Sequence, residues 1–359
     1  MVNNAIPTEP IGSIPRPIEL IEAYKLFSKG ELPKIKLDEM AREATICTIR
    51  AFEETGSPCI TDGEQYKFTN FASYCVHGAD NISPNGVKTK FADGHTRCFL
   101  PKLVSAPFRY QHSADEFLDF SLKHSKLPIK QAVISPSMLS LLYPPDGIVG
   151  YPVNKFLQDV ISEHVGEVRR CLDKGSYKVQ IDFTEGRLSL KLDPSGELLK
   201  SFIKLINQGM AYFGPDDLTR IGIHTCPGSD LDSTHSADIN YNFLLPSLFE
   251  LNVGNFYIAM ASEKSPRKTL RMIKQLIKPH QRVFIGVIDP TDPALESPEL
   301  VRDRILEAAE FIPIDQLGSS DDCGFSPFCD DLTTTRELAF NKIRSRVVGT
   351  KMASDILFK

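Results

Sequence analysis

The chain has 359 residues, 42% of them hydrophobic and 24% charged, which is enough to bury a substantial core. A net charge of -5 provides no basic surface for nucleic acid, and no apolar run approaches the roughly 18 residues of a membrane span. The first residues lack the charged and apolar segments of a secretory signal, and the eight cysteines are too sparse for a disulfide framework. We therefore expect a cytoplasmic enzyme with neither a nucleic-acid nor a membrane partner.

The first half of the chain alternates short strands with amphipathic helices. Gly and Pro break the stretch at 10–13, which excludes a helix and leaves a short extended strand. Further strands are predicted at 59–62 and 130–135, and helices at 18–28, 37–55, 114–124 and 153–174. The helix at 37–55 is indicated by apolar or small residues at spacings of three and four: Leu37, Met40, Ala44, Cys47 and Ala51.

Residues 66–112 are the least regular part of the chain, rich in aromatic residues and in Asn-Gly, Asp-Gly and Pro signals. We interpret them as an excursion after the second strand, built as a hairpin or as long loops near the mouth of the active site.

The second half alternates regularly. Strands at 177–182, 220–224, 256–261, 283–289 and 317–321 are each followed by a predicted helix, at 196–212, 239–251, 266–277, 298–310 and 333–357. Eight strands, nearly all followed by helices, predict an α/β fold with a closed (β/α)8 TIM barrel, as one domain over residues 1–359. An open doubly wound sheet is the alternative, but no Gly-x-Gly-x-x-Gly follows any strand.

The strongest chemical signal is the pair His224 and Cys226 at the end of a predicted strand. Residues i and i+2 of a strand point to the same face, so an imidazole and a thiolate can meet at one point. Cys323, at the end of the last strand, supplies a third ligand of the type that zinc prefers. The alternative is that these are a packed core histidine and ordinary buried cysteines.

Other polar residues also follow predicted strands, and barrel enzymes place their active sites at the carboxyl ends of strands. Asp62 and Glu64 lie two residues apart and suit an ammonium group, although a solvated turn would show the same pattern. The remaining positions at the expected mouth are Ser13, Ser135, Asp182 and Asp289. We expect Glu185 and Arg187 to lie in a loop, and His235 and Asp238 either to reach the substrate or to cap a helix.

Six segments occur in an order that resembles the catalytic barrel of cobalamin-independent methionine synthase. They are residues 11–15 (IGSIP), 62–64 (DGE), 179–182 (VQID), 224–226 (HTC), 286–289 (GVID) and 322–325 (DCGF). The chain is most similar to the short single-barrel relatives, which include the epoxyalkane:coenzyme M transferases. The resemblance covers roughly residues 7–350.

The resemblance implies one zinc ion per chain, bound by His224, Cys226 and Cys323, which holds an acceptor thiol as the attacking thiolate. It implies that Ile11, Ser13, Glu64 and Asp182 bind the polar end of that thiol. We add Asp62 and Ser135 as candidate substrate-binding residues, and Asp182 and Asp289 as candidate catalytic carboxylates.

The chain also departs from the family pattern. The family's fourth ligand is a Glu at a position occupied here by Ala259, with Glu263 or Cys329 as candidate replacements. A His that follows the GVID segment in methionine synthase is missing, and a chain without tryptophan has no counterpart for the Trp that stacks on folate. These departures argue against folate as the alkyl donor.

We therefore predict alkyl (methyl) transfer to, or C–S bond chemistry at, a zinc-activated thiol of a small molecule. The partners are that thiol and an alkyl donor, and an oligomer is compatible with the sequence. One alternative is a metal-free barrel enzyme similar to uroporphyrinogen decarboxylase, working through Asp62 and Asp182. A second is a catalytically inactive relative with a binding role.

Overall fold

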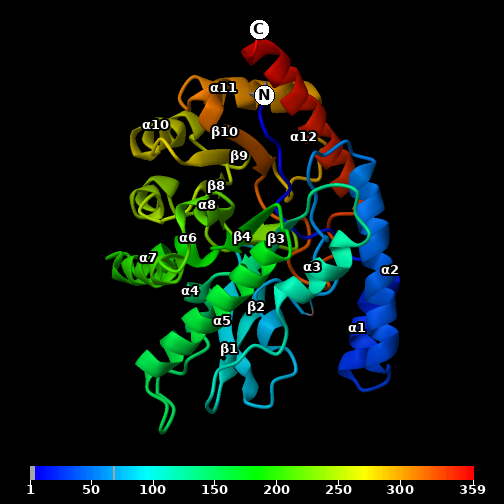
Figure 1. Ribbon diagram of the computed structural model, residues 1–359, viewed down its shortest axis with the longest axis vertical. Helices are drawn as coiled ribbons and strands as arrows, with labels where there is room; N and C mark the ends of the chain where they lie inside the picture. The colour runs from blue at the N-terminus through cyan, green and yellow to red at the C-terminus, as the bar shows by residue number, and fades with distance from the viewer. Residues whose placement is uncertain (1–4, 68) are drawn as a thin grey trace.

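The computed structural model describes residues 5–67 and 69–359. A curled parallel sheet of six strands runs through its centre in the order β10-β9-β8-β5-β4-β3 (Figure 1). The strands are β3 (Lys130–Ile134), β4 (Lys178–Asp182), β5 (Ile221–Thr225), β8 (Asn255–Ile258), β9 (Arg282–Ile288) and β10 (Leu317–Asp321). Most of their residues are buried, as expected for parallel strands covered by helices.

Two extended segments continue the sheet at its two edges. Thr8 forms a parallel bridge with Ser319 of β10, and Ile60 forms one with Ile129, next to β3. The two segments also contact each other, because the Thr61 hydroxyl donates to the Gly12 carbonyl at 2.8 Å. The resulting ring of strand positions is a TIM-like barrel arrangement.

The first two predicted strands are shorter than expected. The stretch predicted at 10–13 contributes its bridge two residues earlier, at Thr8, and the one at 59–62 contributes a single bridge at Ile60. Pro10 has no amide hydrogen to donate to a neighbouring strand, and Gly63 turns the second segment away with a φ of 68°.

Helices surround the sheet (Figure 1). The longer ones are α1 (Ile18–Ser28), α2 (Lys34–Glu53), α3 (Ala114–Leu122), α5 (Val153–Asp173), α6 (Glu185–Leu192), α7 (Glu197–Met210), α10 (Pro266–Leu276), α11 (Pro298–Ala309) and α12 (Arg336–Leu357). Short helices form α4 (Pro136–Ser140), α8 (Pro215–Leu218) and α9 (Leu245–Leu248). Within the described residues, none of these helices combines the length and apolar character that crossing a membrane requires.

Three expectations about helices are wrong. Glu185 and Arg187 lie in helix α6 and are buried rather than in an open loop. The helix predicted at 239–251 is a 3₁₀ turn, Tyr241–Phe243, followed by the short α9, because Pro246 has no amide hydrogen with which to continue a longer helix.

The third concerns the buried face of α2, which passes through Leu37, Ala41, Ala44, Thr48 and Phe52. Cys47 is exposed instead. At about 100° per residue, the ten residues from Leu37 to Cys47 leave a phase difference of about 80°, whereas eleven residues bring Thr48 nearly back into line. The predicted spacing therefore drifted off the buried face.

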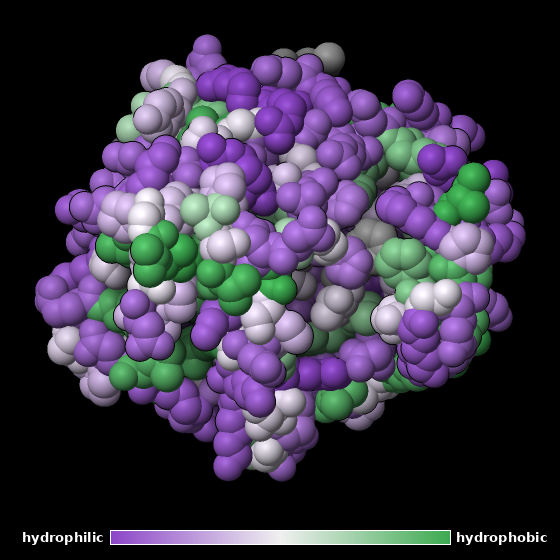
Figure 2. All heavy atoms as spheres, turned by 90° about the horizontal axis from the view of Figure 1, so that it is seen from below, coloured by the Kyte–Doolittle hydropathy of each residue, from purple (hydrophilic) through white to green (hydrophobic). Residues whose placement is uncertain are grey.

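A hairpin occupies much of the irregular stretch 66–112, in which Phe68 lies outside the described residues. Strands β1 (Ile82–Lys90) and β2 (Thr96–Leu103) pair antiparallel. The hairpin meets the loop after β5, which contains β6 (Ser229–Asp230) and β7 (Ser233–Thr234), through a bond from Ala92 N to Thr234 O at 3.0 Å. Seen from the hairpin side, the surface is largely hydrophilic and hollowed near its centre (Figure 2).

Buried ion pairs connect the strands inside the barrel and join the last strand to the last helix. The Glu9 carboxylate accepts from Lys178 Nζ at 2.6 Å and from the Tyr257 hydroxyl at 2.5 Å, and Lys130 Nζ lies 3.7 Å away. On the outer side of β10, Arg346 of α12 pairs with Asp321 and donates to the Glu9 carbonyl at 3.0 Å. Arg346 therefore joins the last helix, the last strand and the first segment.

We predict that Arg346→Met lowers the free energy of unfolding by about 3–5 kcal/mol, because it leaves the Asp321 carboxylate buried without its ion-pair partner. Urea unfolding measures the change. Lys351→Met in the same helix is the matched control, since it removes an exposed pair with Asp355 and is expected to cost less than about 1 kcal/mol. Equal losses in the two variants would contradict the role given to Arg346.

Candidate metal and substrate site

Three metal-competent side chains converge at the carboxyl ends of β5 and β10. His224 lies in β5, and Cys226 is the first residue after that strand. Cys323 lies two residues beyond the end of β10. One ligand atom from each lies within 4.8 Å of the others, and the two sulfurs are 3.4 Å apart. In the part of the chain that the structure describes, this is the single group of three such residues, and all three are buried.

The local backbone allows this convergence at two glycines. Gly228 turns the chain after Cys226 with a φ of 68°, and a Cβ at this position would overlap the His235 ring. A Cβ on Gly324, next to Cys323, would overlap the Ser13 hydroxyl. A larger residue at either position would therefore displace a neighbour of the site.

The donor set fits a zinc ion. Both ring nitrogens of His224 are buried and have no hydrogen-bond partner among the residues described. Sulfurs bound at 2.3 Å to a tetrahedral zinc lie about 3.8 Å apart, close to the observed separation of 3.4 Å. One His and two Cys with a position left open is the ligand pattern of a catalytic zinc.

Protonation of the two thiols is linked. The hydrogen bond between them raises the pKa of Cys226 well above its usual value, and the same bond, with His224 beside it, lowers the pKa of Cys323 well below its own. One sulfur of the pair is thus the better anion before any metal binds.

The fourth ligand position is organised differently from the family pattern. Strand β8 ends at Ile258, three residues earlier than predicted, because from residue 260 onward the backbone N–H groups turn to Asp322. It accepts from Met260, Ala261 and Ser262 at 2.7–2.8 Å. A Cβ on Gly286 would overlap the Asp322 carboxylate, so the small residue on β9 makes room for this arrangement.

Neither candidate replacement for the missing Glu joins the metal-competent group in the described part of the chain. Glu263 lies 3.8 Å from Arg187. Cys329 packs beside the core cluster of Tyr24, and its N–H donates to Thr69 O at 2.9 Å.

The acidic side of the site faces the same small cavity. Ile11, Ser13, Glu64 and Asp182 line it together with His224 and Cys323. Its volume of ≈ 20 Å³ is room for about one water molecule. The sequence analysis selected all six of these residues, and the structure brings them together.

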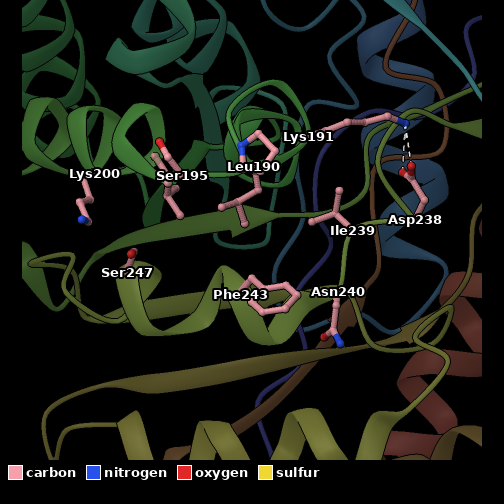
Figure 3. Close-up of a pocket in the computed structure, with 12 residues that line it drawn as sticks. Leu190, Lys191, Ser195, Lys200, Asp238, Ile239, Asn240, Phe243 and Ser247 are labelled. Atoms are coloured by element: carbon pink, nitrogen blue, oxygen red, sulfur yellow. Dashed lines mark hydrogen bonds and ion pairs between the residues drawn. The ribbon is translucent and has the colours of Figure 1, made fainter.

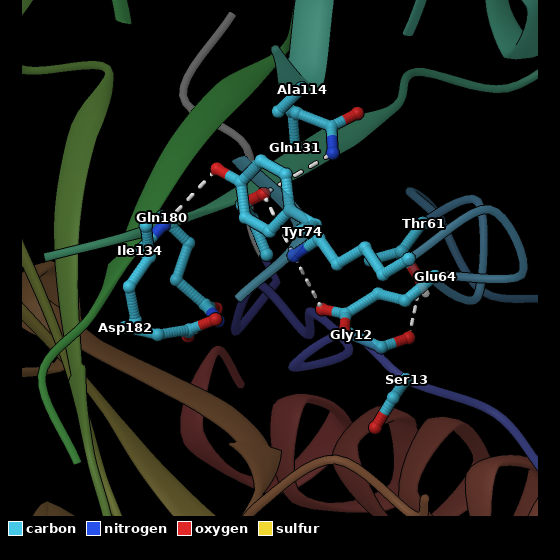
Figure 4. A network of polar contacts seen from close by, with 12 residues as sticks. Gly12, Ser13, Thr61, Glu64, Tyr74, Ala114, Gln131, Ile134, Gln180 and Asp182 are labelled. Atoms are coloured by element: carbon cyan, nitrogen blue, oxygen red, sulfur yellow. Dashed lines mark hydrogen bonds and ion pairs between the residues drawn. The ribbon is translucent and has the colours of Figure 1, made fainter. Parts of the chain in front are cut away.

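Glu64 reaches the cavity through an unusual backbone. It has a φ of 58°, and Gly63 before it has a φ of 68°, so two successive residues are left-handed. Its N–H donates to Asp62 Oδ1 at 2.8 Å, so Asp62 holds the turn rather than lining the cavity. A Cβ on Gly12 would lie 2.5 Å from Glu64 Oε1. Several of these residues are drawn in Figure 4.

Asp182 ends β4 directly beside His224, its partner in the parallel pairing with β5. Burial raises the pKa of this carboxyl to about 6, against the opposing effect of His224. Gln180 donates to Asp182 Oδ1 at 2.8 Å. The group therefore titrates near neutral pH inside the cavity.

The cavity is covered by two segments that pair with each other. Phe71 N donates to Pro327 O at 3.0 Å, and Cys329 N donates to Thr69 O at 2.9 Å. Phe71 and Pro327 line the cavity together with the acids. Phe99 of β2 packs edge-on against Phe71, with ring centroids 5.6 Å apart, so the hairpin supports this cover.

Ser135 and Asp289 also lie outside the cavity lining. Ser135 accepts from Met138 N at 2.9 Å, so it caps α4, and it donates to Glu185 Oε1 at 2.5 Å. Asp289 Oδ1 accepts from the N–H and the hydroxyl of Thr291 at 2.9 and 2.7 Å. Burial, followed by the charge of Asp289, raises the pKa of Asp322 to about 7.

Two buried groups escaped the sequence analysis. Lys67 is completely buried beside Glu64, at 3.2 Å, and Glu185 accepts from both Ser135 and Ser137. A lysine in an irregular stretch gives no pattern that would indicate burial. Glu185 was placed in a loop, although Ser135 and Ser137 lie two residues apart at the end of a predicted strand and could have signalled an acceptor.

A wider cavity of ≈ 660 Å³ lies away from these residues, between α6, α7 and the stretch 238–247. Figure 3 shows its labelled lining residues, with Lys191 paired to Asp238. Asp238 is thus bound to a helix side chain, and His235 is buried with Nδ1 2.6 Å from the Ser236 hydroxyl. None of the three metal-competent residues lines this wider cavity.

Known proteins resemble the chain over almost its whole length. The sequence profile of "Cobalamin-independent synthase, Catalytic domain" matches residues 223–346, which include all three metal-competent residues. "Uncharacterized protein YxjH" of Bacillus subtilis is 25% identical, over 93% of this chain and 91% of that protein. "Methionine synthase" of Thermococcus kodakarensis is 23% identical, over 97% and 93%.

Solved structures show the same fold. A B12-independent methionine synthase from Shewanella sp. W3-18-1, in complex with selenomethionine, has a TM-score of 0.76 at 19% identity, covering 98% of this chain and 99% of that one. A putative vitamin-B12 independent methionine synthase from Listeria monocytogenes has a TM-score of 0.70 at 21% identity, covering 99% of each chain.

The fold and the site together define a TIM-like barrel with a metal-competent His-Cys-Cys group at its mouth. Over residues 223–346, which carry the three metal-competent side chains, the chain is similar to the catalytic domain of cobalamin-independent synthases.

The pKa of Glu185 predicts a pH-dependent stability. Burial raises this pKa from 4.5 to about 7, so folding favours the protonated form. The resulting stabilisation is complete below about pH 4.5 and is lost as the pH rises to about 7. We expect Glu185→Gln to remove this dependence, which is of the order of 3 kcal/mol.

The measurement is the free energy of unfolding by urea between pH 4 and 8, compared between the wild type and Glu185→Gln at each pH. Glu197→Gln, on the exposed part of α7, is the control and should leave the profile of the wild type unchanged. A constant difference between wild type and Glu185→Gln would show that Glu185 has an ordinary pKa.

Proposed function

We propose that the protein is a zinc-dependent transferase that moves an alkyl group, such as methyl, onto the thiol of a small molecule. The observation that carries the proposal is the convergence of His224, Cys226 and Cys323 within 4.8 Å at a cavity lined by carboxylates. A metal bound by His224, Cys226 and Cys323 would hold the sulfur of a small thiol, and the carboxylates would bind a polar group at the other end of the same molecule. Similarity to the cobalamin-independent synthase catalytic domain and to proteins named methionine synthase supports methyl transfer to a thiol.

The chain's residues would divide the work between the two ends of the acceptor. His224, Cys226 and Cys323 would hold zinc, which supplies a thiolate nucleophile at neutral pH by lowering the pKa of a bound thiol from about 8.5. Glu64 and Asp182 would bind an ammonium group, with Ile11 and Ser13 beside them. In the transfer, sulfur forms a bond to the alkyl carbon while the donor leaves with the electrons of the broken bond.

An aminothiol such as homocysteine suits this site. Relatives are named methionine synthase, and methylating the sulfur of homocysteine gives methionine. We propose no folate donor, since the chain contains no tryptophan to stack on it. C–S bond cleavage at the same sulfur is the reverse type of step and uses the same residues.

The remaining predicted residues would support the site. Asp62 would fix Glu64 through its backbone N–H, and Ser135 would hold Glu185. Asp289 lies beside Asp322, so it would influence the turn that carries Cys323. We further propose a single barrel domain and a reducing compartment such as the cytoplasm, because Cys226 and Cys323 must stay reduced to bind metal.

A metal-free barrel enzyme is the second candidate function. It is favoured by the pKa of Asp182, which burial raises to about 6, a value suited to proton transfer. This reading needs no zinc and would tolerate loss of either thiol. An inactive binding relative would fit the lack of a fourth protein ligand at Ala259.

Zinc content distinguishes these functions. We expect about one zinc per chain in protein purified with added zinc, and at least a tenfold loss of zinc affinity in Cys226→Ser and in Cys323→Ser, because each removes one of three ligands. Elemental analysis and a chelator competition measure this.

Cys171→Ser, a buried cysteine of α5 outside the group, is the control and should keep its zinc. Circular dichroism of each variant checks that the fold is retained. Absence of zinc from the wild-type protein, after purification with the metal, would overturn the zinc mechanism and favour the carboxylate chemistry.

A further inference from the structure

Lys67 provides a permanent cation on the acidic side of the site. Its side chain is completely buried, and Nζ lies 3.2 Å from Glu64 Oε1 and 3.2 Å from the Ala132 carbonyl. The Tyr74 ring lies under it, with the centroid at 4.8 Å. Burial acts to lower the pKa of Lys67, but the charges of Glu64, Asp182 and Asp62 outweigh it and raise this pKa. The lysine is therefore charged at neutral pH.

The backbone that carries this pair is held in place from a different part of the chain. Arg16 Nη2 donates to the carbonyls of Glu64 and Lys67 at 2.8 and 2.9 Å. Gln65 Nε2 donates to the Ile14 carbonyl at 2.9 Å. Hydrogen bonds from and to the first segment of the chain thus fix the turn from Glu64 to Lys67.

The two oxygens of Glu64 differ as a result. Oε1 is paired with Lys67 and lies against Gly12. Oε2 is buried and has no hydrogen-bond partner within the described chain, and Glu64 lines the cavity. A buried, unpaired carboxylate oxygen is costly unless a ligand supplies a donor.

The charge balance indicates the type of donor. Three carboxyl groups (Asp62, Glu64 and Asp182) lie close enough to Lys67 to raise its pKa, so acidic groups outnumber the ammonium group on this side of the cavity. A cationic group on a ligand is attracted by these acids, whereas an anionic group would be repelled.

We propose that Lys67 is a positioning residue that makes the site selective for thiols carrying an ammonium group. It holds Glu64 through Oε1, so that Oε2 is presented to the ammonium of the acceptor. This inference rests on the proposed function, which already assigns an ammonium-bearing thiol to the site, and adds the residue that positions Glu64 for it. Lys67 itself need not touch the ligand.

The test compares two thiols that differ in the amine alone, L-homocysteine and 4-mercaptobutanoate, by calorimetry with zinc-loaded full-length protein. We expect the wild type to bind homocysteine at least about tenfold more tightly, as for a charged hydrogen bond. In Lys67→Met the affinity for homocysteine should fall by about tenfold, and that for 4-mercaptobutanoate should stay within about twofold. Lys67→Arg, which keeps the charge, should restore part of the preference.

The double variant Glu64→Gln/Lys67→Met removes the Glu64–Lys67 ion pair as a unit and is the control for folding, since neither member is left buried without the other. It should fold, keep its zinc and lose most of the preference for homocysteine, because Asp182 alone then remains to bind the ammonium group. Equal weakening of both thiols in Lys67→Met, with zinc content unchanged, would make Lys67 merely structural and overturn the inference. Equal binding of both thiols by the wild type would also overturn it while the proposed function stands; binding of neither would overturn both.

Discussion

Burial of the Glu9 carboxylate is the constraint on which the barrel depends. Because a buried charge must be paired, Lys178 and Tyr257 have to point inward to reach it. Side chains of a strand alternate between its two faces, so every second residue counted from these inward residues also points into the barrel. This holds up to the carboxyl ends of the strands, where the site lies. Counted in this way, the series that starts at Glu9 ends at Ser13, the one from Lys178 ends at Asp182, and the one from Tyr257 ends at Ala259. On β5, the same count from the inward-facing Gly222 gives His224 and Cys226.

Cys323 reaches the site by a different route. Ser319 and Asp321 of β10 face α12, where they contact Thr350 and Arg346. An irregularity in the pairing of β10 with β9 follows at Ser320 and Asp321, and the chain beyond it turns inward. Regular alternation supplies two of the metal-competent residues, and a break in regularity supplies the third.

This difference shows what the sequence could predict. The strands of the central sheet lie close to their predicted positions, and His224 with Cys226 follows from the geometry of a strand alone. The burial of Lys67 could not be predicted, because its ammonium group contacts the Ala132 carbonyl and its backbone is held by Arg16, both more than fifty positions away in the chain. The same holds for Asp322, since its partners are N–H groups of the neighbouring strand end. Short-range periodicity carries no information about such contacts, and over α2 it drifted enough to misplace Cys47.

The paired segments over the cavity have a consequence for kinetics. The cavity has room for about one water beside Phe71 and Pro327, so a ligand of several heavy atoms fits only after the residues around it move apart. A ligand that must wait for such a movement binds at an observed rate that levels off at high ligand concentration, whatever the ligand. Its departure waits for the same movement.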